Sequence, residues 1–138
     1  MIASFLGPYR WLSNFHPAPV VLDGVTYPTV EHAFQAAKTL DPLERRRMLL
    51  QPNPGKVKRL GQRVRKRPDW KAVRLSVMFE LLRQKFAHAP LRQALLETGD
   101  AVLIEGNVWG DVYWGQCGGV GQNHLGKLLM RVREEVRA

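Results

Sequence analysis

Residues 29–38 read Thr-Val-Glu-His-Ala-Phe-Gln-Ala-Ala-Lys, and this stretch decides how the first half of the chain folds. Its apolar side chains recur at the i, i+3, i+4 and i+7 spacing of a core-packed helix: Val30, Ala33, Phe34 and Ala37. Thr29 suits the N-cap position, because a threonine hydroxyl can accept a backbone N–H of the first helical turn. The pattern therefore predicts a helix from about Val30 to Leu40.

The polar residues of this predicted helix share a separate face. Glu31, Gln35 and Lys38 stand at i, i+4 and i+7, so a carboxylate, an amide and an ammonium group are aligned over two turns. Such a face lines either a polar cleft or the solvent. Spacing alone favours an exposed surface with a weak charge pair.

Working outward from this helix, the chain predicts a mainly helical α+β fold with a few short strands. Asp23-Gly24 supplies the positive φ angles of a two-residue turn, so residues 20–27 predict a hairpin. Helical spacing predicts further helices at 58–64, 70–87, 90–96 and 125–136. Residues 101–104 predict a short buried strand, and residues 106–121 an irregular segment. This order of elements is not a βαβ repeat, and we expect one domain over residues 1–138.

The composition indicates which kinds of partner the chain can bind and in which compartment it works. It has 138 residues, with 21 Lys and Arg against 12 Asp and Glu, so the formal net charge of +9 favours anionic partners. Much of this charge lies in Arg45–Arg47 and Lys56–Lys71, which could equally be solvated helix faces. No apolar run approaches the ~20 residues that span a bilayer, and the N-terminus lacks the pattern of a signal peptide. Cys117 is the only cysteine, so we expect a cytoplasmic protein without an internal disulfide.

A second concentration of chemistry lies in residues 105–115, where acidic groups alternate with aromatics and glycines. Trp109 and Trp114 could stack on a planar base, as could Trp70 in an earlier segment. Each tryptophan could equally be a core anchor, so the segment alone does not decide between the two roles.

Several other chemistries are disfavoured. Gly121–Lys127 resembles a phosphate-binding P-loop, but Leu128 replaces the Ser or Thr that would bind magnesium. The glycines there could still shape a helix N-terminus that meets an anion through backbone N–H groups. The four histidines show no metal-ligand spacing, and Cys117 has no neighbour in sequence to activate it as a nucleophile.

Segments from nearly the whole chain together resemble the YbiA-like, or NADAR, family. The matching pieces of the first half are Leu12-Ser13-Asn14-Phe15, Asp23-Gly24, Glu31-His32-Ala33-Phe34-Gln35-Ala36-Ala37-Lys38 and Lys58-Arg59-Leu60-Gly61. Those of the second half are Trp70, Met78, Lys85-Phe86, the stretches 95–99 and 103–107, Asp111-Val112-Tyr113-Trp114-Gly115, and the stretch 121–133. Gln62 departs from the pattern, since relatives often carry arginine there. This departure bears on substrate preference.

The resemblance implies a compact, mainly helical domain that hydrolyses N-glycosidic bonds of ribose phosphates or ADP-ribose derivatives, without a metal or other cofactor. Two substrate classes are implied: phosphoribosylaminopyrimidine intermediates of riboflavin synthesis, and ADP-ribosylated guanine in nucleic acid. We expect a monomer or small homo-oligomer. The residues expected to be catalytic are Glu31, Asp111 and Lys38. Those expected to bind substrate are Asn14, Gln35, Lys58, Arg59, Trp70, Trp109, Trp114, Gly115 and Asn123.

The chemistry of C1–N cleavage agrees with these residues. Positive charge develops on the sugar in the transition state, where a carboxylate stabilises it, while a proton must reach the departing nitrogen. Glycoside hydrolases typically use two carboxylates for this work, and Glu31 with Asp111 could form that pair. A variant opens the ribose ring through a transient imine at Lys38, which requires a lysine of lowered pKa. A silent nucleotide-binding module is the alternative of another class.

Overall fold

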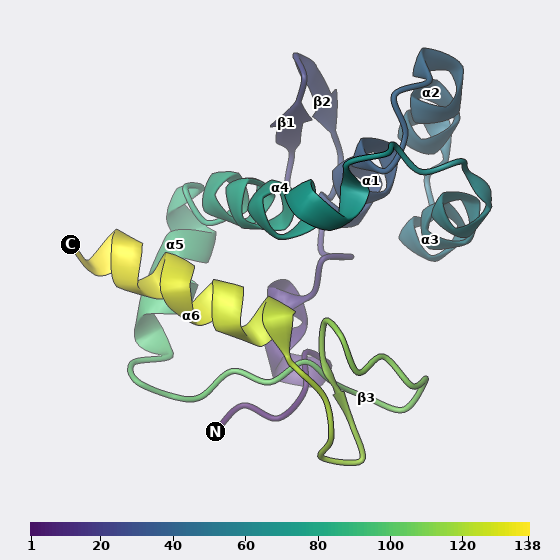
Figure 1. The fold of residues 1–138 in the computed structure, drawn as a ribbon. Coiled ribbons are helices and arrows are strands. Elements are labelled where there is room, and N and C mark those ends of the chain that lie inside the picture. Colours follow the sequence, from purple (N-terminus) through teal and green to yellow (C-terminus); the bar gives the residue numbers. More distant parts are fainter. The chain divides into compact units, whose positions relative to one another are not determined.

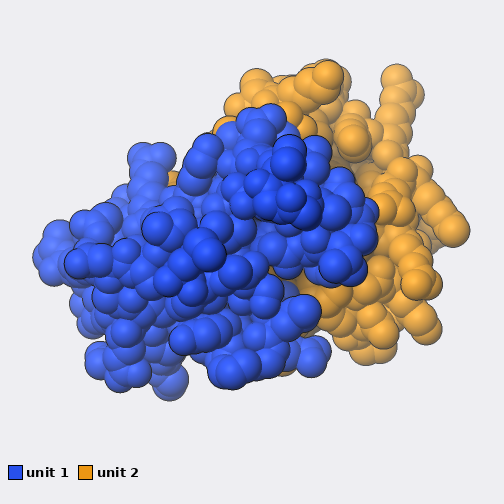
Figure 2. All heavy atoms as spheres, turned by 90° about the horizontal axis from the view of Figure 1, so that it is seen from below, with its two compact units in different colours: residues 1–13, 86–138 blue, residues 14–85 orange.

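The computed structural model describes all 138 residues, which divide into two compact units (Figure 2). Unit 1 comprises residues 1–13 and 86–138, and unit 2 comprises residues 14–85. Helices dominate both units and the strands are short (Figure 1), so the prediction of a mainly helical fold is confirmed. No helix combines the length and the apolar character that crossing a membrane requires.

Unit 2 begins with the predicted hairpin, in which β1 (Val20–Leu22) pairs antiparallel with β2 (Val25–Tyr27). Asp23 and Gly24 at its turn have φ angles of 48° and 81°, as this two-residue connection requires. Three further helices of this unit lie later in the chain. They are α2 (Pro42–Leu50), α3 (Pro54–Arg63) and α4 (Trp70–Lys85).

Helix α1 (Val30–Ala37) is the core of unit 2, since it packs against α2, α3, α4 and the hairpin (Figure 1). The Thr29 hydroxyl accepts the backbone N–H of His32, so the predicted N-cap is confirmed. All eight residues of the helix are buried, including the polar face. The interpretation of Glu31 and Gln35 as an exposed surface is therefore wrong, because α3 and α4 leave only 6% and 4% of these residues exposed.

Helix α2 was not expected from the sequence, because it buries only Met48 and has no apolar stripe. Its start is marked by Asp41, whose carboxylate accepts the backbone N–H of Leu43 at 2.9 Å. Arg45 explains its place in the fold: the guanidinium Nε donates to the carbonyl oxygens of Thr39 (2.8 Å) and Ala36 (3.1 Å). Arg45 thus satisfies the Thr39 carbonyl and adds a second donor to the Ala36 carbonyl, which already accepts the Thr39 N–H.

Unit 1 contains a 3-10 helix, η1 (Gly7–Leu12), and the helices α5 (Ala89–Glu97) and α6 (His124–Arg137). The predicted strand at 101–104 is wrong. Only Ile2 pairs with this segment, through backbone hydrogen bonds to Val102 and Ile104, so Leu103 forms an isolated bridge and no strand. The segment predicted to be irregular contains a minimal parallel pair, β3 (Gly106–Asn107) and β4 (Gln116–Cys117). The amphipathic C-terminal helix is confirmed, and it buries its apolar stripe.

Candidate functional site

The residues predicted to form the site fall in both units. Unit 2 contains Asn14, Glu31, Gln35, Lys38, Lys58, Arg59 and Trp70. Unit 1 contains Trp109, Asp111, Trp114, Gly115 and Asn123. We describe the two groups one after the other.

Within unit 2, the sharpest contact joins Glu31 and Gln35 on α1. The Gln35 amide Nε2 donates to Glu31 Oε1 at 2.7 Å, and both side chains are buried. The backbone N–H of Glu31 donates to the carbonyl of Asn14 at 3.1 Å. The Glu31 carboxylate is thus held by its own helix turn, which places an oriented charge in a partly dry environment.

The charges of two other lysines act on Lys38, which follows the last residue of α1. Lys38 is half-buried, and burial is the main cause that lowers the pKa of its ammonium group. The carboxylate of Glu31 opposes this shift, whereas the positive charges of Lys66 and Lys58 add to it. The repulsion of Lys38 by Lys58 and Lys66 favours an anionic ligand beside Lys38, which would relieve it. Lys66 was missed from the sequence, where it looked like one charge in a solvated run.

The remaining predicted residues of unit 2 occupy different environments. Trp70 is 5% exposed and packs against the Phe34 ring, with centroids 5.1 Å apart at 55°. Asn14 is buried and its amide contacts the sulfur of Met78 at 3.6 Å. Arg59, in contrast, lies exposed on α3. Trp70 and Asn14 are therefore packed into the helical core, and Arg59 is on its surface.

In unit 1, Asp111 lies in a loop that its own side chain organises. Asp111 Oδ1 accepts the backbone N–H groups of Tyr113 (3.1 Å) and Trp114 (2.9 Å). The Asn107 side chain donates to the Asp111 carbonyl at 2.9 Å and accepts its N–H at 3.0 Å. This network orients the carboxylate, since charge-assisted bonds from backbone N–H groups are stronger than neutral ones.

The same loop is packed closely around Glu105, which the sequence-based set of site residues did not include. Asn107 also donates to Glu105 Oε2 at 2.9 Å. A Cβ on Gly115 would lie 1.8 Å from that oxygen, so only glycine fits there. Asn123 accepts the Glu105 N–H at 3.0 Å and donates to the Leu103 carbonyl at 2.9 Å. Gly115 and Asn123 therefore shape the loop by which Glu105 and Asp111 are held.

The aromatic residues of this loop form a cluster at the start of α6. Tyr113 packs against His124 with centroids 4.5 Å apart, and against Trp114 at 5.0 Å. Trp109 differs, since 57% of it is exposed. The backbone N–H groups of His124 and Leu125 donate to the carbonyls of Tyr113 and Trp114. The suggestion that the N–H groups at the start of α6 bind an anion is therefore wrong for these two groups.

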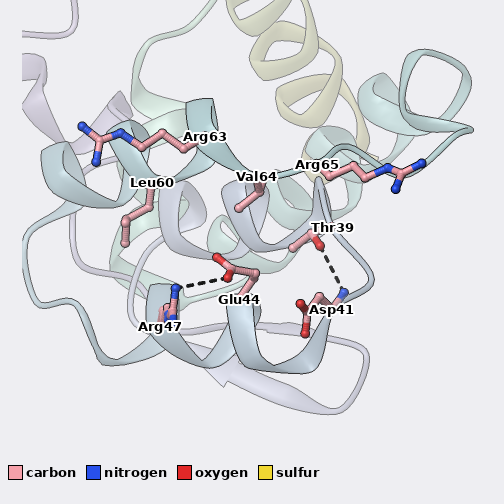
Figure 3. A pocket seen from close by; sticks show the side chains of 8 residues that line it. All are labelled: Thr39, Asp41, Glu44, Arg47, Leu60, Arg63, Val64 and Arg65. Atoms are coloured by element: carbon pink, nitrogen blue, oxygen red, sulfur yellow. Dashed lines mark hydrogen bonds and ion pairs between the residues drawn. The ribbon is translucent and has the colours of Figure 1, made fainter.

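Unit 2 also contains a cleft of about 570 Å³ that none of the predicted site residues lines (Figure 3). It is lined by residues of α2 and α3 and of the segments that follow α1 and α3: Thr39, Asp41, Glu44, Arg47, Leu60, Arg63, Val64 and Arg65. Arg63 and Arg65 extend outward at opposite ends of the cleft, and Arg47 pairs with Glu44 at 3.2 Å (Figure 3). Its acidic and basic groups thus largely offset one another.

Two further buried titratable groups lie in unit 2. His32 contacts the Thr29 hydroxyl at 2.7 Å and the Gln51 carbonyl at 2.6 Å, and burial lowers its pKa. Lys85 is completely buried at the end of α4, and burial lowers its pKa to about 7. His32 is therefore a neutral structural residue, whereas the Lys85 amine is poised to titrate near neutral pH. No three His, Cys, Asp or Glu side chains gather as a metal site would require.

Comparisons with known proteins identify relatives of this chain. The model of the NADAR domain matches residues 4–137. The N-glycosidase YbiA of Escherichia coli K12 is 43% identical over 132 residues, which cover 93% of this chain and 82% of that protein. An N-glycosidase of Nostoc punctiforme is 39% identical, and the match covers 94% of this chain and 87% of that protein. A riboflavin biosynthesis protein of Vibrio vulnificus is 37% identical; the match covers 94% of this chain and 36% of that longer protein.

A solved structure extends this similarity to the fold. The NMR structure of E. coli YbiA superposes with a TM-score of 0.86 at 41% identity, covering 99% of this chain and 83% of that one. The chain therefore belongs to the NADAR family, in which it is similar over most of its length to the YbiA N-glycosidases.

Proposed function

We propose that this protein is an N-glycosidase that hydrolyses the C1–N bond of a phosphoribosylaminopyrimidine. The observation that carries the proposal is the placement of Glu31 in unit 2. The charge of this buried, oriented carboxylate acts on Lys38, on which the charges of Lys58 and Lys66 also act. Hydrolysis of a ribosyl phosphate needs both parts: an acid beside the sugar and cations beside the phosphate.

The relatives support this substrate class. Two of the similar proteins are named N-glycosidases, and the Vibrio vulnificus relative is a riboflavin biosynthesis protein that contains a matching segment. A small phosphorylated ribosyl compound also suits a cluster of only three lysines. We therefore place the reaction on an early riboflavin intermediate, with no metal or other cofactor taking part.

In the proposed reaction the C1–N bond breaks and its electron pair stays with the departing nitrogen, which gains a proton. Water supplies the oxygen that joins C1 and loses a proton to a carboxylate. Glu31 stabilises the positive charge that develops on the ribose or takes up this proton. The two-carboxylate chemistry of glycoside hydrolysis supports a second acid, a role that the family resemblance gives to Asp111.

Lys38 offers a variant of this route. Because burial lowers the pKa of its ammonium group, more of the nucleophilic amine is present at neutral pH than for an exposed lysine. The amine would add to C1 of the ring-opened ribose as the base leaves, and water would then release the sugar. Borohydride with substrate should trap an adduct at Lys38 on this route, and no adduct would leave direct hydrolysis.

A product assay with two substrates side by side tests the proposal. A 5′-phosphoribosylaminopyrimidine should yield free base and ribose 5-phosphate with a higher kcat/KM than ADP-ribosyl-guanine DNA yields its products. Turnover of the DNA alone would replace the proposed substrate, and turnover of neither would refute the N-glycosidase function for these two classes.

A second candidate, hydrolysis of ADP-ribosylated guanine in nucleic acid, rests on a different observation. Residues 14–85 contain 15 Lys and Arg against 6 Asp and Glu, so the whole net charge of +9 lies in unit 2. A polyanion would bind such a surface with an affinity that falls steeply as the salt concentration rises. If the DNA is the substrate, its KM should rise about tenfold or more between 50 and 200 mM salt.

A further inference from the structure

Gly61 of α3 lies directly against the Gln35 side chain of α1. A Cβ built on Gly61 would stand 1.8 Å from Gln35 Oε1, 2.7 Å from its Cδ and 3.1 Å from its Cβ. The first two distances are far inside van der Waals contact. The amide of Gln35 therefore occupies the space in which any larger residue at position 61 would put its side chain.

This close approach explains a glycine that otherwise weakens its helix. Glycine in a helix interior costs about 1 kcal/mol relative to alanine. Gly61 lies within α3 (Pro54–Arg63) and is not among the positive-φ residues, so no unusual backbone conformation requires it. Space for the Gln35 amide is the remaining physical reason for glycine at this position.

The orientation of that amide is determined by Glu31. Gln35 Nε2 donates to Glu31 Oε1 at 2.7 Å, and turning the amide over would bring two oxygens together. Gln35 Oε1, on the other side, is fully buried and accepts no hydrogen bond. Packing against Gly61, and no second hydrogen bond, therefore holds the amide in the position from which it donates.

We infer that Gln35 is a positioning residue that orients the Glu31 carboxylate, and that Gly61 supplies the room this requires. The inference rests on the proposed function, because it assumes that Glu31 acts on the substrate. Gln35 then contributes through Glu31 and not through its own contact with the sugar or base, which differs from the substrate contact expected from the family resemblance. A residue acting in this way affects kcat more than KM.

A double-mutant cycle with a 5′-phosphoribosylaminopyrimidine as substrate tests this inference. Gln35→Ala should lower kcat about 10- to 100-fold, as misplaced catalytic groups do, with KM within about threefold of wild type. Gly61→Ala should cause a similar loss, because its methyl group displaces the amide. The kcat of the double variant should be no lower than that of Gln35→Ala. Once the amide is absent, the methyl group at position 61 contacts only the Cβ of residue 35.

Three further variants keep the test decisive. Gln35→Met fills the same space without a donor and should lose kcat like Gln35→Ala, even if Gly61→Ala fails to fold. Gln93→Ala removes the matched but exposed Gln93–Glu97 pair (3.2 Å) on α5 and should leave kcat unchanged. Glu31→Gln reports on the proposed function itself.

The outcomes separate the two claims. Wild-type kcat in Gln35→Met, a loss confined to KM, or additive losses in the double variant would overturn the inference, provided that Glu31→Gln is inactive. Full turnover by Glu31→Gln would instead refute the catalytic role of Glu31, and the inference would fall with it.

Discussion

The two units of this chain differ in how they carry charge. Unit 2 contains 15 basic and 6 acidic residues, whereas unit 1 contains 6 of each. Glu31 of unit 2 lies on a buried helix, where its charge acts on Lys38, and Asp111 of unit 1 lies in a loop organised by backbone N–H groups. The two candidate acids are therefore held by different means: Glu31 by the side chain of Gln35, and Asp111 by backbone N–H groups.

The largest effect is expected from removing the charge of Asp111 while keeping its loop. In Asp111→Asn, the side-chain oxygen can still accept the N–H groups of Tyr113 and Trp114, so only the carboxylate is lost. If Asp111 is a catalytic acid or base, kcat should fall by about 10²- to 10⁴-fold with the melting temperature nearly unchanged. Asp100→Asn, an exposed site in unit 1, is the control.

Wild-type turnover in Asp111→Asn would give a different account of unit 1. Asp111 would then be a structural cap of its loop, and unit 2 would contain the chemistry alone. Asp111→Ala, which also breaks the turn, should lower the melting temperature on either account.

The next largest effect is expected on the free energy of unfolding, and it comes from Lys85. Its pKa is about 7 in the folded protein and near 10.5 when the chain unfolds, so the unfolded state binds more protons between these values. The free energy of unfolding should therefore rise with pH over this window, by up to about 5 kcal/mol. Lys85→Met should remove this rise and be more stable than wild type near pH 6.

Denaturant titrations at pH 6, 8 and 10 measure this difference. Lys71→Met is the matched control, because Lys71 lies exposed on the same helix. Parallel stability curves for Lys85→Met and wild type would show that the buried amine does not titrate in this range.

The smallest effect is expected from single members of the lysine cluster. Lys66→Ala should raise KM for the phosphorylated substrate by about tenfold, the size of one charge-assisted contact, with little change in kcat. Lys56→Ala, exposed on α3, should change KM by less than twofold. Equal effects in the two variants would mean that the general charge of unit 2 matters, and not the lysines that act on Lys38.

The sequence predicted the elements whose signals are local. The hairpin turn at Asp23-Gly24, the start of α1 at Thr29 and the amphipathic α6 each depend on neighbouring residues or one helical stripe. Helix α2 lacked such a stripe and was missed. Its carbonyl contacts through Arg45 depend on the tertiary fold, which no local pattern contains.

For the candidate site, spacing predicted which residues share a helix face but not the environment of that face. Spacing placed Glu31 and Gln35 on one face of a helix and then assigned that face to solvent, because α3 and Gly61 are distant in sequence. Lys85 carried an overlooked signal: it stands seven residues after buried Met78 and three after buried Leu82, on the apolar side of α4. A charged residue in such a stripe indicates a buried amine.

The most direct test of the account is single-turnover hydrolysis of a 5′-phosphoribosylaminopyrimidine by Glu31→Gln, together with the affinity of this variant for the substrate. The glutamine keeps the shape and removes the charge. We predict that release of the base falls by at least about 100-fold, while the dissociation constant stays within a few-fold of wild type. Base release at the wild-type rate would contradict the central role of Glu31.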